Sequence, residues 1–313
     1  MSDAGYAIEL SAVIVAVTGG RPRVLTVDRG EAIPSGPFQS DHRTLELGLR
    51  AWVEASTRHP LGYVEQLYTF ADRDRTTGED LRTIALSYLA LTREEPEASG
   101  AGAAWRDWYE YFPWEDRREE QPDPVGEVVA PRLLAWADAA DTLADRRIRR
   151  QRAALMFGLE GSPWNEEVAL QRYELLYEAG LLPEAERARE PSVKAVGNPL
   201  PDLGRPMVHD HRRILATGLS RLRAKIKYRP VVFELMPPSF TLLQLQQAVE
   251  ALAGRRLHKQ NFRRLVEHQG LIEETGEVLS DTGGRPARLV RFRREVLMQR
   301  AVAGTRLSLS RTG

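Results

Sequence analysis

Two short amphipathic segments separated by a tight turn, and then a hairpin, constrain the fold of this chain more than any other feature. In TLLQLQQAVEAL the apolar residues recur at helical spacing, and Thr241 is a suitable N-cap. Gly254 ends this helix, and a second helix is predicted over LHKQNFRRLVEHQGLI, with Phe262, Leu265 and Val266 buried. Two short strands joined by a GGRP loop follow. This order predicts a winged helix-turn-helix.

The second of these helices presents amide and guanidinium groups on its outward side. Such a helix fits the major groove of DNA, about 12 Å wide, and these groups suit base edges and phosphates. The arginines of the hairpin are placed to reach a neighbouring phosphate or a narrow minor groove. The alternative is a winged helix that contacts protein and carries arginines for solubility. The predicted DNA-binding residues are Thr241, Lys259, Gln260, Asn261, Arg263, Arg264, Arg285 and Arg288.

The charge of the chain changes sign along its length. Residues 211–300 contain 18 Lys and Arg against 8 Asp and Glu, whereas residues 1–210 contain 24 against 36. Such an asymmetry indicates a polyanionic partner for the C-terminal part, and double-stranded DNA is the partner expected. A protein-interaction scaffold is a further hypothesis. It predicts that DNA binding has no steep salt dependence, whereas a protein that neutralises several phosphates loses DNA affinity sharply as the salt concentration rises.

Length and composition limit the remaining possibilities. A chain of 313 residues with 42% hydrophobic residues predicts two domains. The chain has no cysteine, which excludes disulfides and thiolate zinc sites. The apolar run from Leu10 to Val17 is too short to cross a bilayer, and the N-terminus lacks a basic leader. We therefore expect a cytoplasmic protein with no membrane role.

The first hundred residues predict an α+β arrangement of two strands, a helix and two further strands. An aromatic cluster at Trp105–Trp114 follows, and its rings either cover a hydrophobic face or stack on a purine. Helical patterns dominate over residues 131–158 and 164–190, and the basic run DRRIRRQR is interpreted as a solvated helix face. A helix from His209 to Tyr228 is predicted to join two bodies, with an apolar stripe on one side and an exposed cationic face of Arg213, Arg221, Arg223 and Lys227 on the other.

The stretch from Gly36 to Thr57, GPFQSDHRTLELGLRAWVEAST, has the spacing of the Nudix hydrolase signature. Arg50, Trp52 and Glu54 stand in register with it. The other glutamates and the closing glycine of the signature are replaced by His42, Ala51, Ala55 and Thr57. Pyrophosphate hydrolysis needs Mg²⁺ held by several hard oxygen ligands, so Glu54 alone predicts no substantial hydrolysis and no metal site.

Together with this stretch, five further segments resemble the NrtR-like transcriptional regulators of NAD metabolism, which are related to Nudix enzymes. The segments are YVEQLYTFADRDR, IALSYLAL, RLRAKIKYRPVVFELMPPSFTLLQLQ, NFRRLVEHQGLIEETGE and GGRPARLVRF. The resemblance implies a Nudix-like α/β/α sandwich with a helical insertion, followed by a winged helix. The insertion favours the alphaproteobacterial branch. The implied boundaries are 1–114 for the ligand-sensing domain, 115–206 for the insertion, 207–228 for a connecting helix, 229–300 for the winged helix and 301–313 for a flexible tail.

The same resemblance implies a repressor of NAD biosynthesis or salvage genes that senses ADP-ribose, NAD or ATP without hydrolysing it and needs no cofactor. It implies a homodimer on a two-fold operator. The alternative is a working Nudix hydrolase whose carboxylates are displaced to Glu46, Glu65 or Asp72. Glu54 has a further interpretation as the partner of Arg50 or Arg58 in a surface ion pair. The implied ligand-binding residues are Arg29, Arg50, Glu54, Tyr68, Phe70 and Arg73.

Overall fold

The computed structural model describes residues 6–39, 42–57, 61–71, 76–77, 81–94, 102–120, 122–187, 201–228, 230–279, 286–293 and 295. Its contacts group the chain into two units. The first, here called the sheet unit, comprises Met1–Leu235 and Ala248–Arg256. The second, the winged-helix unit, comprises Met236–Gln247 and Leu257–Gly313. The sequence-based domain boundary between residues 228 and 229 differs from this division and stays a prediction.

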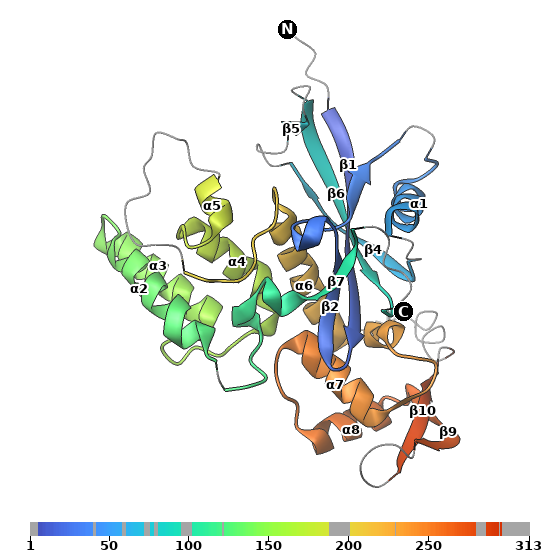
Figure 1. Ribbon diagram of the computed structural model, residues 1–313. Helices are drawn as coiled ribbons and strands as arrows, with labels where there is room; N and C mark the ends of the chain where they lie inside the picture. Colours follow the sequence, from blue (N-terminus) through green and yellow to red (C-terminus); the bar gives the residue numbers. More distant parts are fainter. Residues whose placement is uncertain are drawn as a thin grey trace, which may run out of the picture. The chain divides into compact units, whose positions relative to one another are not determined.

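A mixed sheet forms the centre of the sheet unit (Figure 1). Among the described residues it has seven strands, in the order β4-β6-β1-β2-β7, with β3 beside β1 and β5 beside β6. The long strands β1 and β6 run parallel, and the other pairs are antiparallel. The elements are β1 (Tyr6–Thr18), β2 (Arg21–Thr26), η1 (Asp28–Gly30), β3 (Ser35–Pro37), α1 (Leu45–Thr57), β4 (Tyr63–Phe70), β5 (Thr76–Thr77), β6 (Leu81–Leu91) and β7 (Ala104–Asp107).

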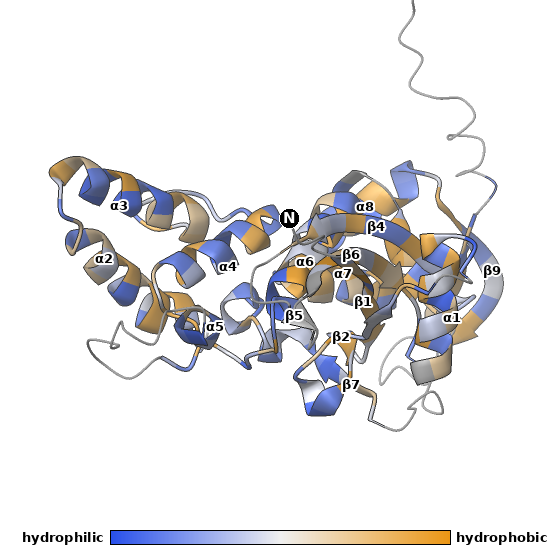
Figure 2. Ribbon diagram, turned by 90° about the horizontal axis from the view of Figure 1, so that it is seen from above, coloured by the Kyte–Doolittle hydropathy of each residue, from blue (hydrophilic) through white to orange (hydrophobic). Residues whose placement is uncertain are grey.

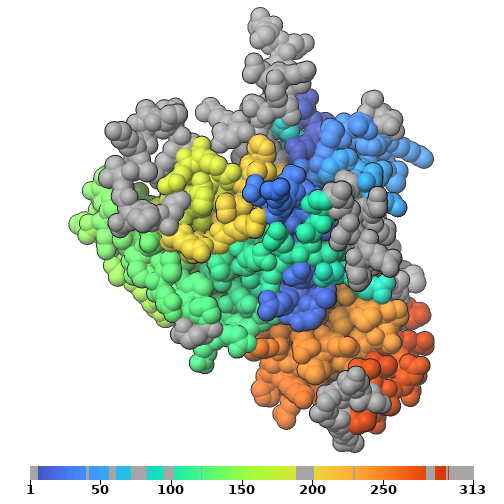
Figure 3. Space-filling model, viewed as in Figure 1, coloured from blue at the N-terminus to red at the C-terminus, as the bar shows by residue number. Residues whose placement is uncertain are grey.

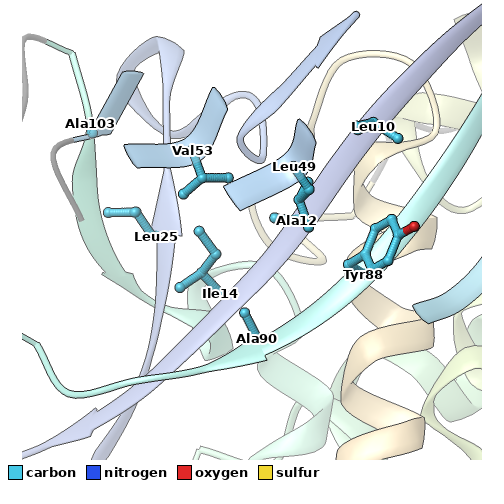
Figure 4. Close-up of a cluster of buried hydrophobic side chains, with 9 residues drawn as sticks. All are labelled: Leu10, Ala12, Ile14, Leu25, Leu49, Val53, Tyr88, Ala90 and Ala103. Atoms are coloured by element: carbon cyan, nitrogen blue, oxygen red, sulfur yellow. The ribbon is translucent and has the colours of Figure 1, made fainter. Parts of the chain in front are cut away.

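Helix α1 covers one face of this sheet. Its Leu49 and Val53 are fully buried and pack with alternate residues of β1, among them Ala12 and Ile14 (Figure 4). Alternate residues of a strand point to opposite faces, so this set defines the α1 face. It consists of Leu10, Ala12, Ile14, Leu25, Leu49, Val53, Tyr88, Ala90 and Ala103.

Helix α6 (His211–Tyr228) covers the opposite face, so the expected α/β/α sandwich is present (Figure 2). Its Gly218 lies against Val13: a Cβ on this glycine would be 2.8 Å from the Val13 side chain. On the same face, Ser11 donates a buried hydrogen bond of 3.0 Å to Ser87. The helix predicted to connect two bodies is therefore the second helical layer of the sandwich.

The helical segment precedes α6 in the chain and packs beside it through α4. Short helices η3 (Trp108–Glu110) and η4 (Pro113–Glu115) lead into it from β7. Of the aromatic cluster, Trp108, Tyr109, Tyr111, Phe112 and Trp114 are buried, which confirms the interpretation as a hydrophobic layer. The segment then contains η5 (Val125–Val129), α2 (Ala130–Asp138), α3 (Leu143–Phe157), η6 (Glu166–Val168), α4 (Ala169–Glu178) and α5 (Pro183–Arg187), and η7 (Val231–Leu235) follows α6.

The winged-helix unit has the predicted order of two helices and a hairpin. Helix α7 (Leu242–Ala253), whose second half belongs to the sheet unit, is followed by α8 (Lys259–His268). Strands β9 (Ile272–Leu279) and β10 (Ala287–Phe292) form the wing, and β8 (Phe240–Thr241) pairs with β10 to complete a small sheet. The described part of the chain contains no helix long and apolar enough to span a membrane.

Candidate DNA-binding surface and ligand pocket

Helix α8 separates an apolar side from a polar side. Phe262 and Val266 are each 8% exposed and anchor it to the unit. Five of the side chains predicted to bind DNA lie on this helix, all at exposed positions: Lys259, Gln260, Asn261, Arg263 and Arg264. The Arg264 guanidinium donates to the Asn261 side-chain oxygen at 3.3 Å, so these two groups are held close together. The surface therefore offers the amide and guanidinium donors that base edges and phosphates accept.

Leu265 and Thr241 have surroundings that differ from those predicted. Leu265 was expected to be buried, but it is 56% exposed. A helix turns by about 100° per residue, so Leu265 falls outside the narrow stripe defined by Phe262 and Val266. Thr241 is buried, and its hydroxyl accepts from the Gln244 amide at 3.1 Å while the Gln244 side chain accepts from the Thr241 amide. This is a capping box, so the structure gives Thr241 an N-cap role, and its DNA contact stays a prediction.

The wing carries arginines that are paired with its own glutamates. Arg288 contacts Glu274 at 2.7 Å and Arg291 contacts Glu273 at 2.5 Å, both across the β9–β10 ladder. Both arginines are well exposed, so these pairs are weak and exchangeable for phosphate. Arg285, the other predicted wing contact, lies outside the described residues.

The landmarks of the Nudix-like stretch are held together by packing. Gly36 on β3 lies under the Trp52 indole, where a Cβ would be 2.1 Å from the indole nitrogen. Arg50 pairs with Glu46 at 3.0 Å and donates to the carbonyls of Leu61 and Gly62. Arg50 therefore ties α1 to the residues that precede β4, which is a structural reason for keeping this part of the motif.

The carboxylates near this stretch do not form a metal site among the described residues. Glu54 is exposed, and Arg50, one of its two expected partners, contacts Glu46 instead. Of the carboxylates in the hydrolase alternative, Glu46 is thus engaged, and Glu65 forms an ion pair with Lys225 of α6. Asp72 and Arg58 lie outside the described residues.

The remaining ligand-binding predictions fall in two separate places. Tyr68 and Phe70 on β4 are in edge-to-face contact, with ring centroids 5.5 Å apart, and Phe70 lies under the Arg213 guanidinium of α6. Phe70 is thus on the α6 face, whereas Arg50 and Glu54 are on the helix that covers the opposite face. Arg29 is exposed in the η1 turn with a φ of 57°, and Arg73 lies outside the described residues. The members of this set that the structure describes therefore lie in separate places, and their role in ligand binding stays a prediction.

A cavity of about 660 Å³ opens elsewhere on the sheet unit, beside η1. Figure 3 shows the loop 201–208 (yellow) against the η1 turn (dark blue), where the Val208 amide donates to the Glu31 carbonyl at 2.8 Å. Arg205 lines the cavity and also donates to the Arg29 carbonyl at 2.5 Å. The lining carries two guanidiniums, from Arg187 and Arg205, and two carboxylates, from Glu31 and Glu186, so its formal charges balance. The lining residues are Glu31, Pro183, Glu186, Arg187, Arg205, Pro206, Met207 and Val208.

A buried ionic cluster joins the aromatic segment to α4 and α6. The sequence did not predict this cluster. Glu115 is 1% exposed and accepts from the guanidiniums of Arg172 and Arg223, whose side chains are fully buried. Burial by itself raises the pKa of Glu115, but the two guanidiniums outweigh it, so the pKa lies below the usual value of 4.5. Arg223 was expected on an exposed cationic face of α6, and the structure places it in the core.

A third buried arginine holds the start of α6. Arg212 pairs with Glu184 of α5 at 3.3 Å and donates to the Tyr111 carbonyl at 3.0 Å. Its guanidinium also lies 5.6 Å from the Phe112 ring centroid. Burial lowers the pKa of Arg212 from its usual value, with Glu184 opposing this effect. Both ends of α6 are therefore fixed by arginines to segments that come from the helical insertion or its entrance.

Comparison with known proteins identifies the C-terminal domain. Residues 232–292 match the family described as the NrtR DNA-binding winged helix domain. A protein of Acinetobacter baylyi named "ADPR responsive transcriptional repressor NtrR" is 40% identical over 86 residues. That match covers 28% of this chain and 34% of the relative, so the chain aligns with about a third of that protein's length.

Solved structures match over nearly the whole chain. NrtR of Shewanella oneidensis, crystallised with a 27mer DNA, is 18% identical with a TM-score of 0.52, over 93% of this chain and 95% of its own. A MutT/nudix family protein of Enterococcus faecalis is 15% identical with a TM-score of 0.53, over 92% and 86%. The fold is therefore a Nudix-like α/β domain followed by a winged helix domain, as expected from the sequence.

Proposed function

We propose that this chain, which has the fold and the winged-helix domain of the NrtR family of Nudix-related transcriptional regulators, is a repressor that binds operator DNA and responds to an adenine nucleotide. The observation that carries the proposal is α8, an amphipathic helix within an NrtR-type domain whose outward side presents Lys259, Asn261 and Arg264. Such a helix inserts into the major groove, while the wing contacts the neighbouring backbone.

ADP-ribose is the first candidate effector. The relative from Acinetobacter baylyi is named as responsive to ADPR, and this favours ADP-ribose over NAD and ATP. The control of NAD biosynthesis or salvage genes and a homodimer on a two-fold operator complete the proposal. Both derive from the resemblance of the sequence to the NrtR-like regulators.

The sheet unit is proposed to bind the nucleotide without hydrolysing it. Phosphoanhydride hydrolysis in a Nudix site needs several carboxylates around Mg²⁺. In this chain Glu46 is paired with Arg50 and Glu65 with Lys225, and both cations compete with a metal ion. The runner-up function, a hydrolase with displaced carboxylates, requires these pairs to break.

We expect ADP-ribose to change the affinity of the full chain for its operator by about 5–150-fold, a coupling of about 1–3 kcal/mol. The measurement is a footprint on the DNA upstream of the chain's own gene, followed by titration of ADP-ribose, NAD and ATP in a gel-shift assay. Unchanged operator affinity with all three nucleotides contradicts the sensor proposal. Turnover of ADP-ribose with Mg²⁺ at about 1–10³ s⁻¹ favours the hydrolase instead.

Two matched variants locate the effector site. Glu54→Ala tests the Nudix-like stretch, because this exposed side chain is in the predicted ligand set. Arg205→Ala tests the cavity beside η1, which Arg205 lines. A rise in the dissociation constant of ADP-ribose for only one variant, measured by calorimetry without DNA, assigns the site. No change in either variant contradicts both locations.

Replacing Glu274 with glutamine is expected to raise the affinity for DNA about two- to fivefold at low salt. The substitution frees Arg288 from a pair of 2.7 Å between side chains that are 74% and 61% exposed. Solvent screens an exposed pair of this kind, so its loss costs little stability and leaves the cation available to phosphate. Glu277→Gln, an equal change of charge on β9, is the control. An equal gain in both variants shows that only net charge matters.

A further inference from the structure

Helix α7 is the first helix of the helix-turn-helix, but its second half belongs to the sheet unit. Residues Leu242–Gln247 group with the winged-helix unit, and Ala248–Arg256 group with the sheet unit. The helix itself is continuous from Leu242 to Ala253. An α-helix is stiff along its axis, so displacement of its last turn is transmitted to its first.

The carbonyl groups at the end of α7 are hydrogen bonded by groups of the sheet unit. The Tyr109 hydroxyl donates to the Ala251 carbonyl at 2.7 Å, and Arg223 Nε donates to the Leu252 carbonyl at 2.9 Å. The Arg117 amide donates to the carbonyl of Gly254 at 2.7 Å. The last four carbonyls of a helix lack intrahelical partners, and a cation there is favourable. These three donors therefore form a specific attachment.

The attachment is close-packed as well as hydrogen bonded. Gly254 has a φ of +72°, and a Cβ at this position would be 2.2 Å from the Glu115 carbonyl oxygen. Burial raises the pKa of Tyr109 to about 12, so its hydroxyl stays protonated and donates over the physiological range. Arg223 comes from α6, the helix that covers the sheet, and Glu115 fixes its guanidinium. The end of α7 is thus joined to the sandwich through α6.

We propose that Tyr109 and Arg223 are positioning residues for DNA binding, which hold the end of α7 and transmit effector-dependent movement of the sheet unit to the recognition helix α8. The inference rests on the proposed function. Only residues 254–258 separate α7 from α8, so the position of the α7 end determines where the recognition helix begins. The contacts belong to neither the DNA-binding surface nor the predicted ligand set.

The test compares Tyr109→Phe with Tyr111→Phe in the full chain. Both substitutions remove one buried hydroxyl that donates to a carbonyl at 2.7 Å, from Ala251 in the first case and from Gly30 in the second. The readout is the ratio of operator affinities without ADP-ribose and at saturating ADP-ribose, together with thermal stability. We expect Tyr109→Phe to reduce this ratio about two- to tenfold, the equivalent of one hydrogen bond, and Tyr111→Phe to leave it unchanged.

Arg223→Lys provides a second variant, because lysine keeps a positive charge beside Glu115 but cannot reproduce the bond from Arg223 Nε to Leu252. We expect Arg223→Lys to reduce the ratio of operator affinities without and with ADP-ribose about as much as Tyr109→Phe does. An equal ratio in wild type, Tyr109→Phe and Tyr111→Phe overturns the inference. If wild type itself does not respond to ADP-ribose, the proposed sensor function fails. The operator affinities of the variants without ADP-ribose then test the positioning role. Weaker binding only in Tyr109→Phe and Arg223→Lys supports the positioning role, and equal binding in all variants rejects it.

Discussion

Glu115→Gln is expected to lower the free energy of unfolding by about 3–5 kcal/mol, the largest stability change of any single substitution considered for this chain. The carboxylate accepts from Arg172 at 2.5 and 2.8 Å and from Arg223, and all three side chains are fully buried. Glutamine fits the same space but leaves two guanidiniums in the core without a counter-charge. Urea denaturation followed by tryptophan fluorescence measures the loss, because Trp164 stacks on Arg172 at 3.9 Å.

The difference between wild type and this variant is expected to shrink in acid. The folded-state pKa of Glu115 is lowered, because its two arginine partners outweigh the effect of burial. A carboxyl with a lowered pKa contributes stability above its unfolded pKa, which is 4.5, and loses it as the pH falls through the folded value. Wild type therefore begins to approach the variant below about pH 4.5, and the difference is lost only when the pH has fallen through the folded pKa, where Glu115 itself becomes neutral.

Glu178→Gln is the matched control for Glu115→Gln. Glu178 also faces an arginine, Arg152, with two contacts between the groups, but both side chains are 43–48% exposed. Such a surface pair contributes about 0–1 kcal/mol, since solvent screens the charges. A loss at Glu115 no larger than that at Glu178 would show that the buried cluster contributes nothing special to stability.

The local patterns of the sequence predicted most elements of the fold. Short runs rich in β-branched and apolar residues became β1 and β6, and the spacing of apolar residues placed α1, α7 and α8 within a few residues of their observed limits. The Nudix-like spacing survives for a reason that the structure makes visible, because Gly36 must admit the Trp52 indole. These features are short-range, because the type of each residue reflects its own local surroundings.

What the sequence could not predict depends on contacts between distant segments. Arg223 was expected to be exposed because a cation on an amphipathic helix is usually solvated. Its partner Glu115 lies 108 positions away, and a single sequence contains no signal for that pairing. The same limit applies to the ligand set, because the face that a β4 residue such as Phe70 occupies depends on register. A bulge between β4 and β6, at Gln66–Thr69, changes that register.

The DNA-binding surface supports the second large prediction, that Arg264→Ala and Arg263→Ala each weaken operator binding by about 1–3 kcal/mol, or about 5–150-fold. Both side chains are exposed on α8, where no described carboxylate neutralises either by an ion pair. A residue that contacts a base should lose discrimination at one operator position. A residue that contacts phosphate should weaken all sequences equally and reduce the salt slope by about one.

The control for these variants is Arg147→Ala on α3, an exposed arginine in the basic run of the helical insertion. It changes the net charge of the chain by the same amount without touching the winged helix. If Arg147→Ala weakens operator binding as much as Arg264→Ala, then the chain attracts DNA by its overall electrostatic field, and α8 does not recognise the operator sequence. If only the α8 variants weaken binding, the positive charge of the C-terminal part acts through a specific DNA-binding surface on α8. The acidic N-terminal part is then free to bind the effector.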